Sequence, residues 1–182
     1  MFDAYGRNIH YLRLSVTDLC NLRCRYCMPD GVPKLAHEDI LTYEEFLRLA
    51  ALFAQCGIDT VRITGGEPLV RRGVEQLTAG LKAIPGIRRV ALTTNGVLLA
   101  QKLPACWRRL DSVNISLDTL HPETFRRITG KDELAAVQTH PGGPCQRHSG
   151  QAELCAAARR ERGRAGKPCC LRTGASAAGA LY

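Results

Sequence analysis

The chain has 182 residues, a formal net charge of +8 and 45% hydrophobic residues, enough for one domain with a sizeable core. No stretch approaches the roughly 18 consecutive apolar residues of a membrane span, so we expect no membrane partner. Residues 1–138 hold 18 Lys and Arg against 15 Asp and Glu, so most of the excess positive charge lies in residues 139–182. Because no aromatic residues are interleaved with that charge, we expect no nucleic-acid partner.

Strand and helix patterns alternate along residues 1–138. Short apolar or β-branched runs predict strands at 11–16, 60–64, 89–94 and 111–117. Helical spacing predicts one helix between a Thr42 capping box and Gly57, and further helices near 74–84, 97–103, 122–128 and 132–138. The alternation predicts an α/β fold with a parallel sheet, in which right-handed crossovers curl about four β/α units into an arc.

Residues 139–182 have a different composition. They contain no Ile, Val, Phe, Met or Trp and are rich in Ala, Gly, Arg and Cys, so we expect them to be mostly disordered and separate from the domain at 1–138. So abrupt a change is what a shifted reading frame would produce, a hypothesis that the gene's nucleotide sequence would check. With four strands only, we expect the last strand to leave an unpaired edge and an apolar face of the partial barrel to stay uncovered.

Three cysteines follow the first predicted strand in a C-x3-C-x2-C spacing: Cys20, Cys24 and Cys27. Three such thiolates can hold three irons of a [4Fe-4S] cluster and leave the fourth iron open to a ligand. A zinc site usually takes four ligands in paired motifs, and no second pair follows nearby. The chain has nine cysteines, an odd number, and its start shows no secretory pattern, so a disulfide framework is disfavoured and we expect a cytoplasmic protein.

Polar and glycine residues follow the other predicted strands. In parallel α/β folds ligands bind beyond the carboxyl ends of the strands. Residues 65–67 (Gly-Gly-Glu) end the second strand, where two glycines let the backbone approach a ligand and the glutamate can bind an ammonium. Residues 93–96 end the third strand, and Asn114, Ser116 and Asp118 share one side of the fourth.

Two arginines lie within predicted strands. Arg13 and Arg62 have apolar neighbours, and an inward-facing strand arginine is costly unless it meets an anion such as phosphate. The pair Arg71 and Arg72 is instead expected to be solvated at the surface.

The motifs at 3–7, 11–18, 20–29, 62–71, 93–96, 111–118 and 121–130 together resemble a known family. That family is molybdenum cofactor biosynthesis protein A, the GTP 3′,8-cyclases of the radical S-adenosylmethionine (SAM) superfamily. The resemblance covers about residues 2–137, and it implies a partial (β/α) barrel of the radical SAM type, truncated after about four units.

The resemblance implies a set of site residues and a reaction. The cluster would be ligated by Cys20, Cys24 and Cys27. SAM would be bound by Tyr26, Gly66, Glu67 and Ser116, and GTP by Arg13, Arg62 and Thr93. A 5′-deoxyadenosyl radical made from SAM would convert GTP to 3′,8-cyclo-7,8-dihydro-GTP. A low-potential electron donor is implied as a partner, and a homodimer as the assembly.

The family's second [4Fe-4S] cluster is not encoded in this sequence. Its three cysteines lie further downstream in the family, and the tail cysteines Cys145, Cys155, Cys169 and Cys170 do not reproduce their spacing. Besides an active cyclase, the sequence therefore leaves open a truncated, catalytically incompetent fragment that at most binds a cluster and SAM. It also leaves open a shorter radical SAM enzyme with another substrate.

Overall fold

The computed structural model describes residues 2–28, 39–106, 109–139 and 152–155. Its sheet runs in the order β1-β2-β3-β4-β5, and the first four strands are parallel. These strands are β1 (Tyr11–Ser15), β2 (Thr60–Thr64), β3 (Arg89–Thr94) and β4 (Ser112–Ile115). The helices are α1 (Tyr43–Gln55), α2 (Val74–Ala83), α3 (Leu99–Cys106), α4 (Pro122–Thr129) and α5 (Leu134–Gln138), with a short 3-10 helix η2 (Pro68–Val70) after β2. The predicted βαβ alternation is confirmed, and each predicted element lies within three residues of the observed one.

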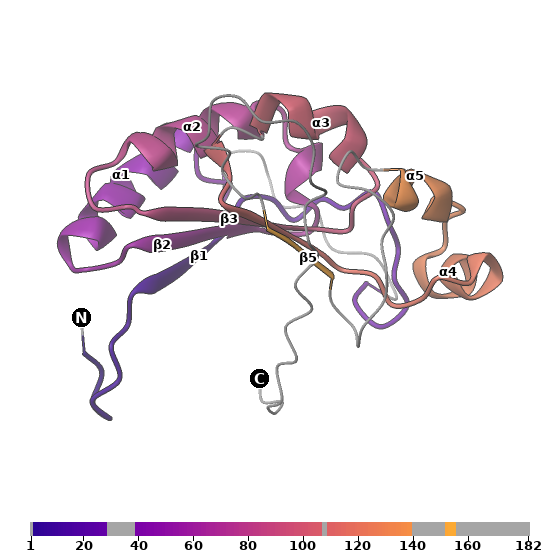
Figure 1. Cartoon of the computed structure of the whole chain (residues 1–182), viewed down its shortest axis with the longest axis horizontal. Helices are drawn as coiled ribbons and strands as arrows, with labels where there is room; N and C mark the ends of the chain where they lie inside the picture. Colours follow the sequence, from indigo (N-terminus) through magenta and orange to yellow (C-terminus); the bar gives the residue numbers. More distant parts are fainter. Residues whose placement is uncertain (1, 29–38, 107–108, 140–151, 156–182) are drawn as a thin grey trace, which may run out of the picture.

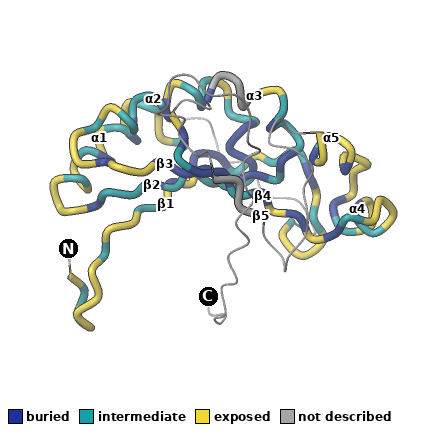
Figure 2. The backbone as a smooth tube through the Cα atoms, in the orientation of Figure 1, coloured by how far each residue is buried: buried dark blue, intermediate teal, exposed yellow. Residues whose placement is uncertain are grey.

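The helices α1, α2 and α3 cover one face of the sheet (Figure 1). Side chains on that face are buried because successive strand residues point to opposite faces and the apolar ones point toward the helices. The core strand residues include Leu14, Val61, Ile63, Val90, Leu92 and Val113. Each such side chain contributes about 1.5–3 kcal/mol when it is fully buried. Figure 2 shows these buried segments running through the middle of the molecule, while the N-terminal segment and much of α4 are exposed.

The opposite face of the sheet is polar, which corrects the prediction of an uncovered apolar face. Arg13 pairs in register with Arg62, and Thr93 pairs with Asn114. All four side chains are exposed or half-buried, whereas their neighbours on the helix side, apart from the half-buried Leu12, are buried. The strands therefore alternate between apolar positions that face the helices and polar positions that face the barrel interior, where a polar ligand can meet them.

The edge of β4 is paired, which corrects a second prediction. Residues Ala152–Cys155 form β5, antiparallel to β4, with Val113 opposite Leu154. The sequence was expected to leave this edge free because the segment around β5 has no β-branched or aromatic pattern. An edge strand offers unpaired N–H and C=O groups that any extended backbone can satisfy, whatever its side chains. The remainder of the predicted disordered tail, beyond Thr139, lies outside the described residues.

The start of α1 has the predicted capping box. The Thr42 hydroxyl accepts a hydrogen bond from the Glu45 N–H at 3.2 Å, and the Thr42 N–H donates to Glu45 Oε2 at 2.7 Å. In the described part of the chain, no helix has the length and apolar character needed to cross a bilayer.

Arg71 binds the end of β1 rather than solvent. Its Nη1 donates to the Val16 carbonyl and its Nη2 to the Leu41 carbonyl, both at 2.6 Å, and the guanidinium lies 4.4 Å from the centre of the Tyr43 ring. The prediction of a solvated side chain was therefore wrong for Arg71, although it holds for the exposed Arg72. A guanidinium fork can join two carbonyls in this way because it presents several donors in one plane.

Replacing Arg71 with alanine is expected to lower the free energy of unfolding by about 2 kcal/mol or more, because two charge-assisted hydrogen bonds and a cation–π contact are lost. Urea denaturation of the purified chain measures this. The matched control is Arg72→Ala, expected to change stability by no more than about 0.5 kcal/mol because that side chain is exposed. Equal effects of the two substitutions would contradict the assignment.

Candidate functional site

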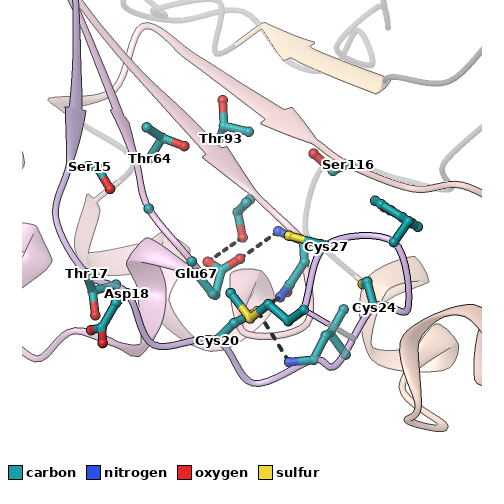
Figure 3. A pocket seen from close by; sticks show the side chains of 17 residues that line it. Ser15, Thr17, Asp18, Cys20, Cys24, Cys27, Thr64, Glu67, Thr93 and Ser116 are labelled. Atoms are coloured by element: carbon teal, nitrogen blue, oxygen red, sulfur yellow. Dashed lines mark hydrogen bonds between the residues drawn. The ribbon is translucent and has the colours of Figure 1, made fainter. Parts of the chain in front are cut away.

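A pocket of about 420 Å³ lies at the carboxyl ends of the parallel strands. In Figure 3 the strand-end residues Ser15, Thr64, Thr93 and Ser116 follow one another from β1 to β4. The loop after β1 passes across the opening and brings all three cysteines of the C-x3-C-x2-C spacing into the lining, together with Tyr26. The Gly65-Gly66-Glu67 segment completes the wall. The pocket thus gathers the predicted cluster ligands and all four predicted SAM-binding residues.

Backbone hydrogen bonds join the cysteine loop to the end of α4. The Arg23 N–H donates to the Thr129 carbonyl at 2.8 Å, and the Arg25 N–H donates to the Ile128 carbonyl at 3.0 Å. These bonds use carbonyls at a helix C-terminus, which have no partner within the helix. They fix the stretch around Cys24 although about a hundred residues separate the two segments. Nothing in the local sequence signals this pairing, because backbone groups alone make it.

Cys20 and Cys24 are half-buried, whereas Cys27 is exposed. The Cys20 sulfur accepts from the Leu22 N–H at 3.4 Å and is 3.7 Å from the Asn95 side-chain nitrogen. Burial raises the pKa of the Cys24 thiol, and the neighbouring Cys20, Asp118 and Cys27 raise it further. Such a group becomes a thiolate readily only when a positive centre compensates the buried charge, as an iron does.

The donor set fits a multi-iron cluster, because three cysteines line one pocket. Among the residues that the structure describes, no group of three or more His, Cys, Asp or Glu side chains converges closely enough to hold a single ion. A [4Fe-4S] cluster takes one thiolate per iron, so its cysteines surround a volume instead of a point. Three cysteines around one pocket, with N–H donors directed at Cys20, meet that requirement.

The glycine pair allows β2 to pack against the segment that leads into the cysteine loop. A Cβ atom on Gly65 would lie 2.6 Å from the Thr17 carbonyl oxygen, and one on Gly66 would lie 2.4 Å from that of Leu19. Two hydrogen bonds join the segments, from the Gly66 N–H to Thr17 at 2.7 Å and from the Glu67 N–H to Leu19 at 2.8 Å. The sequence predicted that the glycines serve close approach to a ligand; the structure shows that they also serve close approach of the chain to itself.

Glu67 is fully buried, and protein donors surround its carboxylate. Oε1 accepts from the Leu69 N–H at 3.0 Å and the Thr94 hydroxyl at 2.8 Å, while Oε2 accepts from the Asn95 N–H at 2.7 Å. Burial raises the pKa of this carboxyl, and the three hydrogen bonds oppose that rise. Glu67 therefore joins the end of β2 to the end of β3. Its predicted contact with an ammonium group stays a prediction.

Tyr26 connects the cysteine loop to the end of β4. Its hydroxyl donates to Asp118 Oδ2 at 2.8 Å, although the residue as a whole is 70% exposed. Burial of the hydroxyl end and the nearby Asp118 carboxylate raise the pKa of Tyr26 above its ordinary value. The polar alternation in the sequence had placed Asp118 on this side of the strand, but it gave no partner for it.

A second, smaller pocket of about 150 Å³ lies on the polar face of the sheet. It brings together the three predicted GTP contacts, Arg13, Arg62 and Thr93, with Tyr11 and Asn114 beside them. Arg62 Nη1 donates to the Thr93 hydroxyl at 3.4 Å, and its guanidinium is 5.8 Å from the centre of the Tyr11 ring. Thr93 and Ser116 line both pockets, so the two sites are adjacent.

The sequence profile of the radical SAM superfamily matches residues 14–138, and the chain belongs to this superfamily. Two curated relatives indicate a particular branch. The chain is 59% identical over 143 residues to the GTP 3′,8-cyclase of Heliobacterium modesticaldum and 54% identical over 140 residues to that of Geobacter sulfurreducens. The matches cover 76% and 75% of this chain. It spans 43% of the length of each of these relatives.

The fold is also similar to that of a solved structure. Streptococcus suis SuiB, in its crystal structure bound to S-adenosylmethionine, superposes with a TM-score of 0.56 at 20% sequence identity. The match covers 71% of this chain and 30% of that one. At this identity the likeness concerns the fold alone; together with the superfamily profile it confirms the predicted partial (β/α) barrel of the radical SAM type.

Proposed function

We propose that this chain carries the cluster and SAM half-site of a GTP 3′,8-cyclase, which converts GTP to 3′,8-cyclo-7,8-dihydro-GTP. The observation that carries the proposal is the strand-end pocket, because it joins the three cysteines, the glycine pair and Ser116 in one cavity. The superfamily profile supports it, since it matches residues 14–138 and so includes every residue that lines this pocket, and the two relatives at 59% and 54% identity carry that name.

The residues around the larger pocket would act by binding and orienting. Cys20, Cys24 and Cys27 would each ligate one iron of a [4Fe-4S] cluster, and the bound, reduced cluster would supply the electron that cleaves SAM. The SAM molecule itself would contact Tyr26, Gly66, Glu67 and Ser116. The close packing of the glycine pair against residues 17–19 would hold the Gly65-Gly66-Glu67 segment, which would contact SAM, at a fixed distance from the cysteine loop.

The smaller pocket would hold the substrate. Arg13 and Arg62 are neighbours on adjacent strands, and two guanidinium groups side by side form a site for an anion such as a triphosphate. Thr93 lies on the boundary of the two pockets, so a GTP molecule bound there would be in contact with the SAM site. Positioning the two reactants together is how the protein would direct the radical chemistry.

The remaining assignments follow from the same proposal. A low-potential electron donor would reduce the cluster, and the homodimer implied by the resemblance is the proposed assembly. Free thiolates for the cluster are maintained in reducing compartments, and we therefore propose a cytoplasmic activity. The second candidate function is a chain that binds a cluster and SAM without cyclising GTP. It is favoured by the small volume of the proposed substrate pocket, about 150 Å³.

Anaerobic reconstitution with iron and sulfide, followed by assay with SAM and dithionite, tests both candidates. We expect about four irons per chain and formation of 5′-deoxyadenosine. Replacing Cys24 with alanine should abolish both, whereas replacing the exposed Cys56 should change neither. The cyclase proposal further requires that GTP yields the cyclised nucleotide and that Arg62→Ala reduces this product without reducing iron content.

The outcomes separate the candidates. Cluster and 5′-deoxyadenosine without cyclised nucleotide would support the second candidate and reject the first for this chain. A chain that incorporates no iron, or whose iron content is unaffected by Cys24→Ala, would reject both.

A further inference from the structure

Asn95 lies directly after β3, and its side chain reaches Cys20, a predicted cluster ligand in the loop after β1. Its Nδ2 atom is 3.7 Å from the Cys20 sulfur and 2.7 Å from Asn21 Oδ1. Its backbone N–H donates to the buried Glu67 carboxylate at 2.7 Å. Asn95 therefore connects the glutamate of the Gly-Gly-Glu segment with the first cysteine of the loop.

The hydrogen bonds of Asn95 define the orientation of its amide. Its Oδ1 accepts from the Val97 N–H at 3.1 Å, and a backbone N–H can bond only to the oxygen end of the amide. The NH2 end must then face Asn21 and Cys20, and its two hydrogens match two acceptors, Asn21 Oδ1 and the Cys20 sulfur. The flipped amide would direct an oxygen at both acceptors and a nitrogen at the Val97 N–H.

We propose that Asn95 is a positioning residue that donates an N–H···S hydrogen bond to the Cys20 thiolate when Cys20 ligates the cluster, and thereby raises the reduction potential of that cluster. This inference rests on the proposed function, since it requires Cys20 to be a ligand. Reduction adds negative charge that spreads onto the ligand sulfurs, and a donor directed at a sulfur stabilises it. The Leu22 N–H at 3.4 Å is a second donor to the same sulfur, which no side-chain substitution removes.

The test is a redox titration of the reconstituted full chain, followed by electron paramagnetic resonance. Asn95→Ala removes the side-chain donor and keeps the backbone hydrogen bond to Glu67. It should lower the ratio of reduced to oxidised cluster at a fixed potential by about threefold to tenfold. A tenfold change corresponds to a shift of about 59 mV in the reduction potential. Asn95→Asp keeps the shape and the Val97 bond but directs a charged oxygen at the sulfur, so its decrease should be larger. Asn8→Ala removes an exposed asparagine of the N-terminal segment, which lines neither pocket, and should leave the potential unchanged.

A second measurement reports on the contact itself. In the wild-type chain carrying asparagine labelled with ¹⁵N at the side-chain amide, the reduced cluster should show a weak ¹⁵N hyperfine coupling. Because Asn21 Oδ1 also lies 4.0 Å from the Cys20 sulfur, the part of the coupling that Asn95→Ala removes is the part that belongs to Asn95. Absence of that part in the wild type, or unchanged potentials in both Asn95 variants, would overturn the inference. Iron content distinguishes this failure from that of the proposed function, because a wild-type chain that binds no cluster rejects both, whereas a full cluster with unchanged potentials rejects the role of Asn95 alone.

Discussion

Replacing Glu67 with alanine is expected to lower the free energy of unfolding by at least about 3 kcal/mol. The substitution leaves three donors without their acceptor, the N–H groups of Leu69 and Asn95 and the hydroxyl of Thr94, in a place that water does not reach. Each buried donor that loses its partner costs about 1–3 kcal/mol. Urea denaturation measures the loss, and Glu44→Ala, at an exposed position in the first turn of α1, is the control, with an expected effect within about 0.5 kcal/mol.

The pH dependence of stability gives the same residue an independent signature. Because burial raises the pKa of Glu67 above its ordinary value of 4.5, the folded chain holds this proton more tightly than the unfolded chain does. The stability that Glu67 contributes is therefore present in full below pH 4.5 and is lost as the pH rises through the raised pKa. The stability difference between the wild type and Glu67→Gln should shrink as the pH is raised from 4.5 toward neutrality. A difference that grows over this range would show that the hydrogen bonds outweigh the burial.

The sequence was sufficient to predict the four parallel strands and the helices between them because the decisive signals are local. The strand at 60–64 is a short β-branched run, and the helix at 43–55 has its capping box and its apolar face within a few residues of one another. That the site residues come together also follows from local signals. The carboxyl ends of parallel strands lie at the same edge of the sheet, so motifs after β1, β2, β3 and β4 must lie close to one another. Cys20, Gly66, Thr93 and Ser116 lie around one pocket for this reason.

What the sequence did not predict depends on contacts between distant segments. The pairing of β5 with β4 and the bonds from Arg23 to Thr129 involve backbone groups, which every residue has. Arg71 was assigned to the surface together with Arg72, but its two carbonyl partners lie 30 and 55 residues away. The face of the sheet opposite the helices was expected to be apolar although Arg13, Arg62 and Asn114 were already assigned to the barrel interior. The alternation of the strands makes that face polar.

Gly66→Ala is expected to have the largest effect on the site itself. Its Cβ would lie 2.4 Å from the Leu19 carbonyl oxygen and 2.6 Å from that of Asp18, closer than Cβ atoms come to backbone oxygens. Backbone cannot rotate away as a side chain can, so the segment leading to Cys20 must shift and the two hydrogen bonds that join it to β2 must stretch. We expect a loss of about 3 kcal/mol or more in the free energy of unfolding and a reduced iron content after reconstitution.

Gly80→Ala is the matched control because it introduces the same methyl group against a neighbour that can move. In α2 its Cβ would lie 2.7 Å from the methyl carbons of Leu47, the far end of a flexible side chain. Alanine also favours a helix interior over glycine by about 0.5–1 kcal/mol, which offsets part of the crowding. We therefore expect a stability change within about 1 kcal/mol and unchanged iron content. If Gly66→Ala is as mild as Gly80→Ala in both measurements, the two backbone segments are not held in the close contact on which the site depends.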